Sequence, residues 1–207
     1  MQYQSIGEQF REQFQILVAD TNELKNEVFK IRYEVYCQEL NYESSEKFPS
    51  FQETDSYDEH SIHCLLKHRQ SNTYTGCIRL VFPNTENPER SLPLTRVCQL
   101  DLDLNQLSLH YYGEVSRLAV RGQFRRRTGE AQTPGGLLIF PHQTNDPQEK
   151  RGFPIIALSL YLAATCLAVE TGMVRVFVLM EPRLARHLRY FGFFFTCYYN
   201  LTNLLVN

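Results

Sequence analysis

One apolar run constrains the fold of this chain more than any other feature. Residues 155–169 read IIALSLYLAATCLAV and carry no charged side chain. The run is shorter than the roughly 20 apolar residues that cross a bilayer, and Ser159 and Thr165 interrupt it. It therefore predicts a helix buried in a protein core, without a transmembrane segment. Gly172 follows shortly and is expected to be the C-cap of this helix.

The composition allows such a core. The chain has 207 residues, of which 43% are hydrophobic and 21% are charged, the usual balance for a globular protein. We expect one domain spanning residues 1–207. The net charge of −2 gives no general reason to expect nucleic acid as a partner. The polar N-terminus is no signal peptide, so a cytoplasmic location is expected.

The cysteines also indicate a reducing compartment. They are spread along the chain without a short C-x-x-C pair, and several lie in apolar runs. Buried free thiols are therefore favoured over a disulfide framework. The six positions are Cys37, Cys64, Cys77, Cys98, Cys166 and Cys197.

Hydrophobic periodicity predicts strands and helices in alternation. Asp20 is expected to cap a helix, with Glu23 as its capping-box partner, and Leu24, Val28, Ile31 and Val35 form an apolar stripe along that helix. Strands are expected at 14–19, 61–68, 74–82, 113–120 and 174–180, and helices at about 22–40, 155–171 and 181–192. Residues 121–154 read as an irregular insertion, and 193–207 are β-prone. This order indicates a mixed α/β (α+β) fold with helices packed on a largely antiparallel sheet.

The acidic stretch ETDSYDEH at 53–60 is the first candidate site. Taken alone, Glu53, Asp55 and Asp58 are most simply an acidic surface turn. A calcium loop would need more oxygen ligands and a glycine at its sharp turn. A zinc site is disfavoured because neighbours such as His63 and Cys64 point to opposite faces of a strand. The wall of a substrate pocket is the third possibility, and the stretch alone favours the surface turn over it.

Three arginines also have both a structural and a functional interpretation. Glu114 and Arg117 face opposite ways on a regular strand, but a β-bulge would bring them to one side; the alternative is a surface ion pair. Arg79 lies among apolar residues of a strand, so it must reach the sheet edge or find a buried carboxylate, for which Asp55, Asp58 and Glu114 are available. Arg32 shares a helix face with Tyr36, although a solvated arginine is the simpler interpretation.

A run of arginines, Arg125, Arg126 and Arg127, is the last candidate. Such a run is most often a solvated charge cluster. It could instead hold a pyrophosphate or the acidic face of a carrier protein.

Taken together, these motifs resemble a known family. R-x3-[FY]-x5-aromatic (Arg32, Tyr36, Tyr42), E-x-D-x-Y-D (53–58), R-L at Arg79 and E-x-S-R (114–117) follow in the order found in the acyl-homoserine-lactone (autoinducer) synthases. The second half, with VSRLAV, FRRR, FPIIALSLYLAA and LMEPRLARHLRYFG, is similar to the acyltransferases associated with PEP-CTERM/exosortase systems. Both groups are related to N-acyl amino acid synthases.

The resemblance implies a GNAT-like N-acyltransferase fold, with a mixed, mostly antiparallel sheet and helices on both faces. Only 15 residues follow Gly192, so the last strand of that fold is expected to be short or missing. The implied activity moves a fatty acyl group from a thioester to the amine of a small acceptor such as an amino acid. The alternatives are a lactone synthase using S-adenosylmethionine, or a truncated inactive homologue. The chain has Tyr42 and no tryptophan where the autoinducer synthases usually have Trp, which weighs against S-adenosylmethionine.

The same resemblance implies roles for single residues. Glu114 is the expected catalytic base and Arg117 its partner. The acceptor pocket is expected to be formed by Arg32, Tyr36, Tyr42, Asp55, Asp58 and Arg79. Arg125, Arg126 and Arg127 are expected to receive an acyl carrier protein. The donor is an acyl-phosphopantetheine thioester on that carrier or on CoA, and no tightly bound cofactor is expected.

Overall fold

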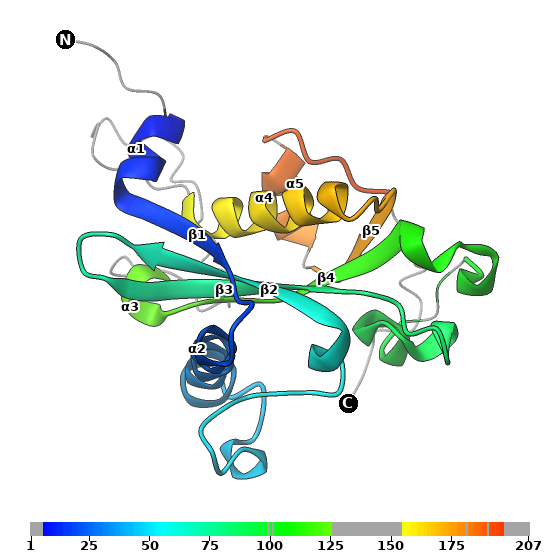
Figure 1. The fold of residues 1–207 in the computed structure, drawn as a ribbon, viewed down its shortest axis with the longest axis horizontal. Coiled ribbons are helices and arrows are strands. Elements are labelled where there is room, and N and C mark those ends of the chain that lie inside the picture. Colours follow the sequence, from blue (N-terminus) through cyan, green and yellow to red (C-terminus); the bar gives the residue numbers. More distant parts are fainter. Residues whose placement is uncertain are drawn as a thin grey trace. The chain divides into compact units, whose positions relative to one another are not determined.

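The structure is a computed structural model, and it describes residues 6–98, 100, 102–125, 155–180, 182–189 and 191–196. Its helices are α1 (Ile6–Gln13), α2 (Asn22–Arg32), α3 (Gly122–Arg125), α4 (Ile155–Glu170) and α5 (Pro182–Arg189) (Figure 1). Its strands are β1 (Phe14–Val18), β2 (Ser61–His68), β3 (Thr73–Val81), β4 (Tyr112–Val120) and β5 (Arg175–Val178). A π-helix, Tyr33–Glu39, continues α2 directly.

The five strands form one sheet in the order β1-β2-β3-β4-β5. β1 runs antiparallel to β2, with Phe14 opposite His68. β4 runs parallel to β5, and their pairing extends from Tyr112 opposite Arg175 to Val115 opposite Val178. The sheet is therefore mixed, which confirms the predicted α/β class.

The chain divides into two compact units. The first comprises residues 1–56, 62–79 and 117–166, and the second comprises 57–61, 80–116 and 167–207. β3 and β4 each contribute residues to both units. The expectation of one domain over the whole chain stays a prediction.

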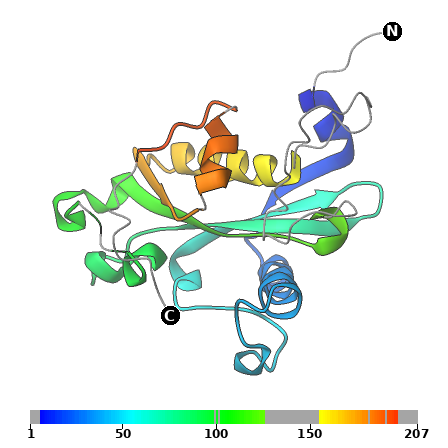
Figure 2. The same cartoon turned by 180° about the vertical axis from the view of Figure 1, so that it is seen from behind.

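The core of the first unit lies between α2 and the sheet. The predicted apolar stripe of the helix is confirmed, because Val28, Ile31 and Val35 are buried against strand residues Leu65 and Cys77. The opposite face of β1–β3 is covered by α4 (Figures 1 and 2). There Gly76 allows close approach, since a Cβ atom at Gly76 would lie 3.2 Å from Cδ1 of Leu160 and 2.7 Å from the carbonyl oxygen of Ala119. Helices thus cover both faces of these strands.

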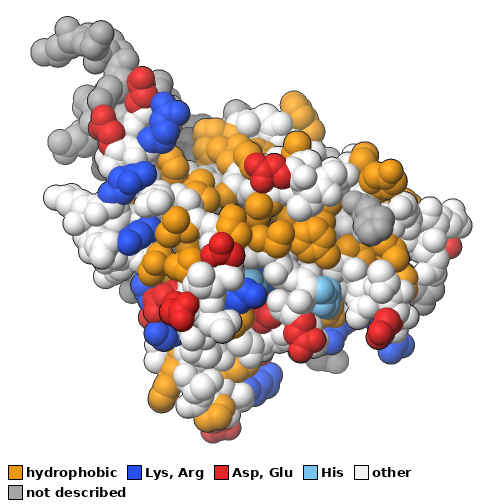
Figure 3. Space-filling model, viewed as in Figure 1, with side chains coloured by type: hydrophobic (Ala, Val, Ile, Leu, Met, Phe, Trp, Pro, Cys, Tyr) orange, Lys and Arg blue, Asp and Glu red, His pale blue; other side chains and the backbone are white. Residues whose placement is uncertain are grey.

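The buried helix predicted at 155–171 is confirmed in part, because one side of α4 is buried and the other is exposed. Leu160 and Ala164 of α4 are buried, but Leu162 and Val169 are 46% and 70% exposed. Apolar side chains consequently gather at the surface over α4 (Figure 3). An all-apolar sequence has no periodicity to show which side packs on the sheet. None of the described helices is long and apolar enough to cross a membrane.

The helix ends are partly as predicted. Gly172 ends α4 with φ of +78°, and its N–H donates to the carbonyl of Val169 at 3.0 Å, which confirms the C-cap. The N-cap of α2 is Thr21 and not Asp20, because the Thr21 hydroxyl accepts from Leu24 N–H at 3.3 Å. Helix α1 was not predicted, and β5 is shorter than the expected 174–180.

The second unit has its own core. It gathers side chains from the end of β3, the start of β4, β5 and the connection between β3 and β4. That connection contains short 3₁₀ helices, including Pro93–Arg96. The buried members are Tyr57, Val81, Leu92, Leu94, Leu104, Tyr112 and Phe177.

The cysteines follow the prediction in part. Cys37, Cys64 and Cys77 are buried free thiols, Cys98 is half-buried and Cys166 is exposed on α4. Cys197, the segment 126–154 and the β-prone residues after 196 lie outside the described part of the chain.

Candidate active site

Five charged side chains meet inside the first unit, and we call them the arginine–carboxylate cluster. They come from α2, from the stretch after residue 52, from β3 and from β4. Arg32 and Arg79 are fully buried, and Glu53 is 1% exposed. The members are Arg32, Glu53, Asp55, Arg79 and Arg117.

Two carboxylates join the three guanidinium groups of the cluster. Glu53 accepts from Nε of Arg32 through Oε2, and from Nε and Nη2 of Arg117 through Oε1 at 3.2 and 3.1 Å. Asp55 accepts from Nη1 of Arg79 at 2.5 Å, and its other oxygen lies 3.3 Å from Nη2 of Arg117. Of the two alternatives predicted for Arg79, the structure shows the carboxylate: of the three acids considered, half-buried Asp55 is the partner.

The backbone holds the acidic stretch in place. The N–H of Glu53 donates to the carbonyl of Phe29 in α2 at 3.1 Å. This bond fixes Glu53 beside Arg32, three residues further along the helix. Removing one partner of such a buried ion pair leaves an uncompensated charge, so the arrangement depends on all its members.

Arg117 interrupts the regular geometry of β4. Its φ is +52°, a left-handed conformation that costs a residue with a Cβ atom about 1–2 kcal/mol. Pairing of β4 with β5 ends two residues earlier, at Val115. The interruption lies in the stretch 114–117, where a β-bulge was one of the two interpretations of the sequence. Burial, the largest single effect, acts to lower the pKa of Arg117, but the charges of Glu53, Tyr36 and Asp55 together outweigh it. The pKa therefore rises and the guanidinium stays charged.

Tyr36 lies beside Arg117, and Tyr42 lies beside Tyr36. The guanidinium lies 5.5 Å from the ring centre of Tyr36, whose hydroxyl donates to the carbonyl of Leu118 at 2.8 Å. Burial raises the pKa of Tyr36, so this hydroxyl keeps its proton. Tyr42 is 58% exposed, with its ring centre 6.4 Å from that of Tyr36. The Tyr42 ring is therefore available at the surface.

Glu114, the predicted base, belongs to the second unit. Its side chain is 2% exposed, and Oε2 accepts from Leu94 N–H of the 3₁₀ helix Pro93–Arg96 at 2.8 Å. The pKa of the half-buried Cys98 thiol is raised. Burial is the larger cause, and the negative charge of Glu114 is the second. Asp58 is also in the second unit, half-buried in the 3₁₀ helix Asp58–His60.

The structure thus brings together part of the predicted set. Arg32, Tyr36, Asp55, Arg79 and Arg117 share one neighbourhood. Tyr42 adjoins it through Tyr36. Arg125 is the last residue of α3, while Arg126 and Arg127 lie outside the described residues. Across the described residues, no three His, Cys, Asp or Glu side chains converge as metal ligands.

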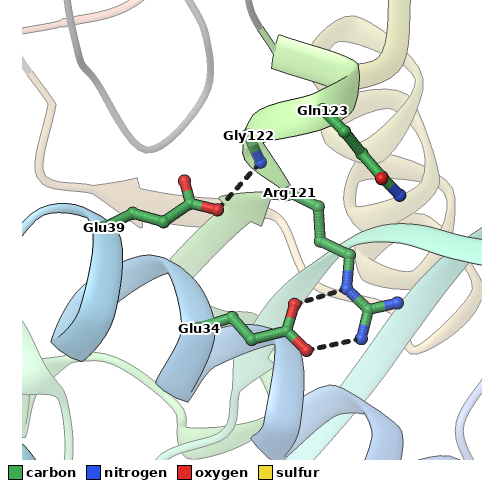
Figure 4. A pocket seen from close by; sticks show the side chains of 5 residues that line it. All are labelled: Glu34, Glu39, Arg121, Gly122 and Gln123. Atoms are coloured by element: carbon green, nitrogen blue, oxygen red, sulfur yellow. Dashed lines mark hydrogen bonds and ion pairs between the residues drawn. The ribbon is translucent and has the colours of Figure 1, made fainter.

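Sequence reasoning did not identify a second polar group, which we call the β4–α3 corner (Figure 4). Arg121 donates from Nε and Nη2 to the two oxygens of Glu34 at 2.6 and 2.9 Å. Its Nη1 donates to the carbonyl of Tyr74 at 2.7 Å. The backbone N–H of Gly122 donates to Oε1 of Glu39 at 3.0 Å. With Gln123, these residues line an open hollow of about 410 Å³.

The π-helix explains why the corner was missed. Glu34 and Glu39 are five residues apart, a spacing that puts two side chains on different faces of an α-helix. A π-helix has i→i+5 hydrogen bonds, as from Leu40 N–H to the carbonyl of Val35 at 3.1 Å, and it brings residues five apart onto one side. No periodicity in the sequence signals this change of helix type.

Comparison with known proteins adds the family. Residues 31–133 match the acetyltransferase (GNAT) domain family. The solved acyl-homoserine-lactone synthase BjaI, described as CoA-dependent and bound to SAM and isopentyl-CoA, superposes with a TM-score of 0.55 at 18% identity, covering 88% of this chain and 72% of BjaI.

Two further autoinducer synthases are similar in structure. LasI superposes with a TM-score of 0.54 at 14% identity, covering 86% of this chain and 78% of LasI. TofI gives a TM-score of 0.54 at 16% identity, covering 85% of this chain and 77% of TofI. These identities are low, so the likeness establishes the fold. No curated protein sequence matches the chain significantly. The chain has the GNAT fold, and its residues 31–133 match the GNAT acetyltransferase domain.

Proposed function

We propose that the protein is an N-acyltransferase that moves a fatty acyl group from a thioester to the amine of an amino acid or a similar small acceptor. The observation that carries the proposal is the arginine–carboxylate cluster. Four residues selected by motif order meet there: Arg32, Arg79 and Arg117 each form an ion pair with half-buried Asp55. The GNAT family match supports the reaction class.

The cluster suits an acceptor with both charges of an amino acid. Arg32 and Arg79 are fully buried, whereas the side chains of Arg117 and Asp55 are 26% and 20% exposed. An acceptor carboxylate would meet the guanidinium of Arg117, and its ammonium group would meet Asp55. Tyr42 offers an exposed ring beside them.

Glu114 is the proposed base. An ammonium group has no lone pair, so it must lose a proton before the nitrogen attacks the thioester carbonyl. Glu114 accepts that proton, directly or through a water. When the C–N bond forms, the nitrogen still carries one proton more than an amide. As the C–S bond breaks, this second proton passes to the departing thiolate, and the proton taken by Glu114 is released to solvent. Backbone N–H groups near the interruption at Arg117, on the same strand as Glu114, would stabilise the intermediate oxyanion.

The proposed donor is an acyl carrier protein, and CoA is the alternative. The run Arg125–Arg127 offers positive charge for the acidic face of such a carrier. The donor arm would lie along β4, where its pairing with β5 ends. We also propose that the protein is related to the acyltransferases associated with PEP-CTERM/exosortase systems. This part of the proposal rests on the sequence motifs in the second half of the chain, such as FRRR and LMEPRLARHLRYFG.

A product search tests the proposed function. Purified protein is incubated with acylated carrier protein or acyl-CoA and a pool of amines that includes amino acids and S-adenosylmethionine, and mass spectrometry looks for N-acyl products. An N-acyl amino acid is the expected result. A lactone product would assign the chain to the lactone synthases. A well-folded sample that forms no product from either donor would contradict the proposal.

A further inference from the structure

A carboxylate of the chain itself occupies the backbone N–H of Gly122, the second residue after β4 and the first of α3. Glu39 accepts from Gly122 N–H, and a Cβ atom placed on Gly122 would lie 2.9 Å from both Glu39 oxygens. The carboxylate therefore packs directly against this backbone. Any other anion that bound to Gly122 N–H would have to displace it.

The guanidinium group of the neighbouring Arg121 is also hydrogen-bonded to other groups of the chain. Arg121 uses Nε and Nη2 for Glu34 and Nη1 for the carbonyl of Tyr74. Turns at the carboxyl ends of strands are ordinary places for ligand phosphates, because backbone N–H groups and basic side chains are available there. In this corner, those donors are already bonded to the chain's own acids and carbonyl.

The net charge of the residues that line the hollow also disfavours the binding of an anion. Glu34 and Glu39 supply two negative charges, and Arg121 supplies one positive charge. CoA carries a diphosphate and a 3′-phosphate, whereas a pantetheine arm on a carrier protein carries one phosphodiester. Electrostatic repulsion at the open hollow therefore acts far more strongly on CoA than on a carrier-bound arm.

We infer that Glu39 is a donor-selectivity residue that excludes the diphosphate of CoA from the β4–α3 corner. This inference rests on the proposed function for the identity of the donor, but it concerns binding and is measurable without turnover. Glu34 supports Glu39 by engaging Arg121. The π-helix presents both carboxylates to the corner.

Calorimetric titration with CoA and with pantetheine, which lacks phosphate, tests the inference. In the wild type we expect CoA to bind no more tightly than pantetheine. In Glu39→Gln the amide neutralises the charge, and we expect affinity for CoA to rise about tenfold while affinity for pantetheine stays unchanged. The matched control is Glu46→Gln, a neutralised acid at an exposed position nearby. Equal CoA affinity in Glu39→Gln and Glu46→Gln would overturn the inference, as would persistent absence of CoA binding in Glu39→Gln.

A salt series on the wild type provides a test that needs no variant. Repulsion is screened by salt, so raising NaCl should leave CoA affinity unchanged or increase it. A marked loss of CoA affinity with salt would show that cations hold the phosphates, and the inference would fail. Because both experiments measure binding, they decide this point even if the search for N-acyl products finds none.

Discussion

At the scale of residues, charged side chains in apolar surroundings are the part of the sequence that best predicts contacts. An arginine between apolar strand residues had to reach the sheet edge or find a carboxylate, and Arg79 finds Asp55. The same reasoning did not rank Glu53, although it is the most buried acid of the cluster and binds both Arg32 and Arg117. A motif shows that acids recur, but only the packing shows which acid is enclosed.

Replacement of Glu53 should therefore be costly. In Glu53→Gln, buried Arg32 loses its charged partner, and we expect the free energy of unfolding to fall by about 3–5 kcal/mol. Urea denaturation measures the change. Glu46→Gln, at an exposed position, should alter stability by less than about 0.5 kcal/mol. A loss of similar size in both variants would mean that Glu53 carries no special weight.

At the scale of elements, periodicity located most helices and strands but not their details. The stripe from Leu24 to Val35 placed a helix at 22–40, and the structure has helical geometry from Asn22 to Glu39. Its second half is a π-helix, which no 3.6-residue pattern could reveal. The β4–α3 corner depends on that change. The sequence therefore anticipated part of the cluster and nothing of the corner.

The start of α2 provides a direct check on cap assignment. Thr21→Ala removes the hydroxyl that accepts from Leu24 N–H, and a lost N-cap costs about 1 kcal/mol. Thermal or urea unfolding should show that loss. Asp20→Ala is the matched control at the exposed neighbouring position, with an expected change below about 0.5 kcal/mol. The reverse ranking would restore Asp20 as the cap.

At the scale of the whole molecule, buried thiols and phenols make stability sensitive to alkali. Burial raises the pKa of Cys64 from 9.0 to about 12, and it raises those of Tyr36 and Tyr161 as well. A group whose pKa is higher in the folded state favours folding while it is protonated. Its contribution is complete below the unfolded pKa and is lost as the pH rises through the folded pKa.

Stability should accordingly decline from about pH 9 towards pH 12. For Cys64 alone, the loss between pH 8 and pH 10.5 is about 2 kcal/mol. Urea denaturation at the two pH values measures it. Cys64→Ala should show a correspondingly smaller decline than the wild type. Identical declines would mean that Cys64 does not resist ionisation in the folded protein.

The rate of N-acyl product formation in Glu114→Gln is the sharpest test of acyl transfer with Glu114 as base. The amide can still accept from Leu94 N–H but cannot take a proton, so the fold should survive while chemistry fails. With the acceptor found in the product search, we predict that kcat falls by about 100-fold or more while KM and urea stability change little. A folded Glu114→Gln protein whose kcat stays within about threefold of the wild type would contradict the assignment of the base.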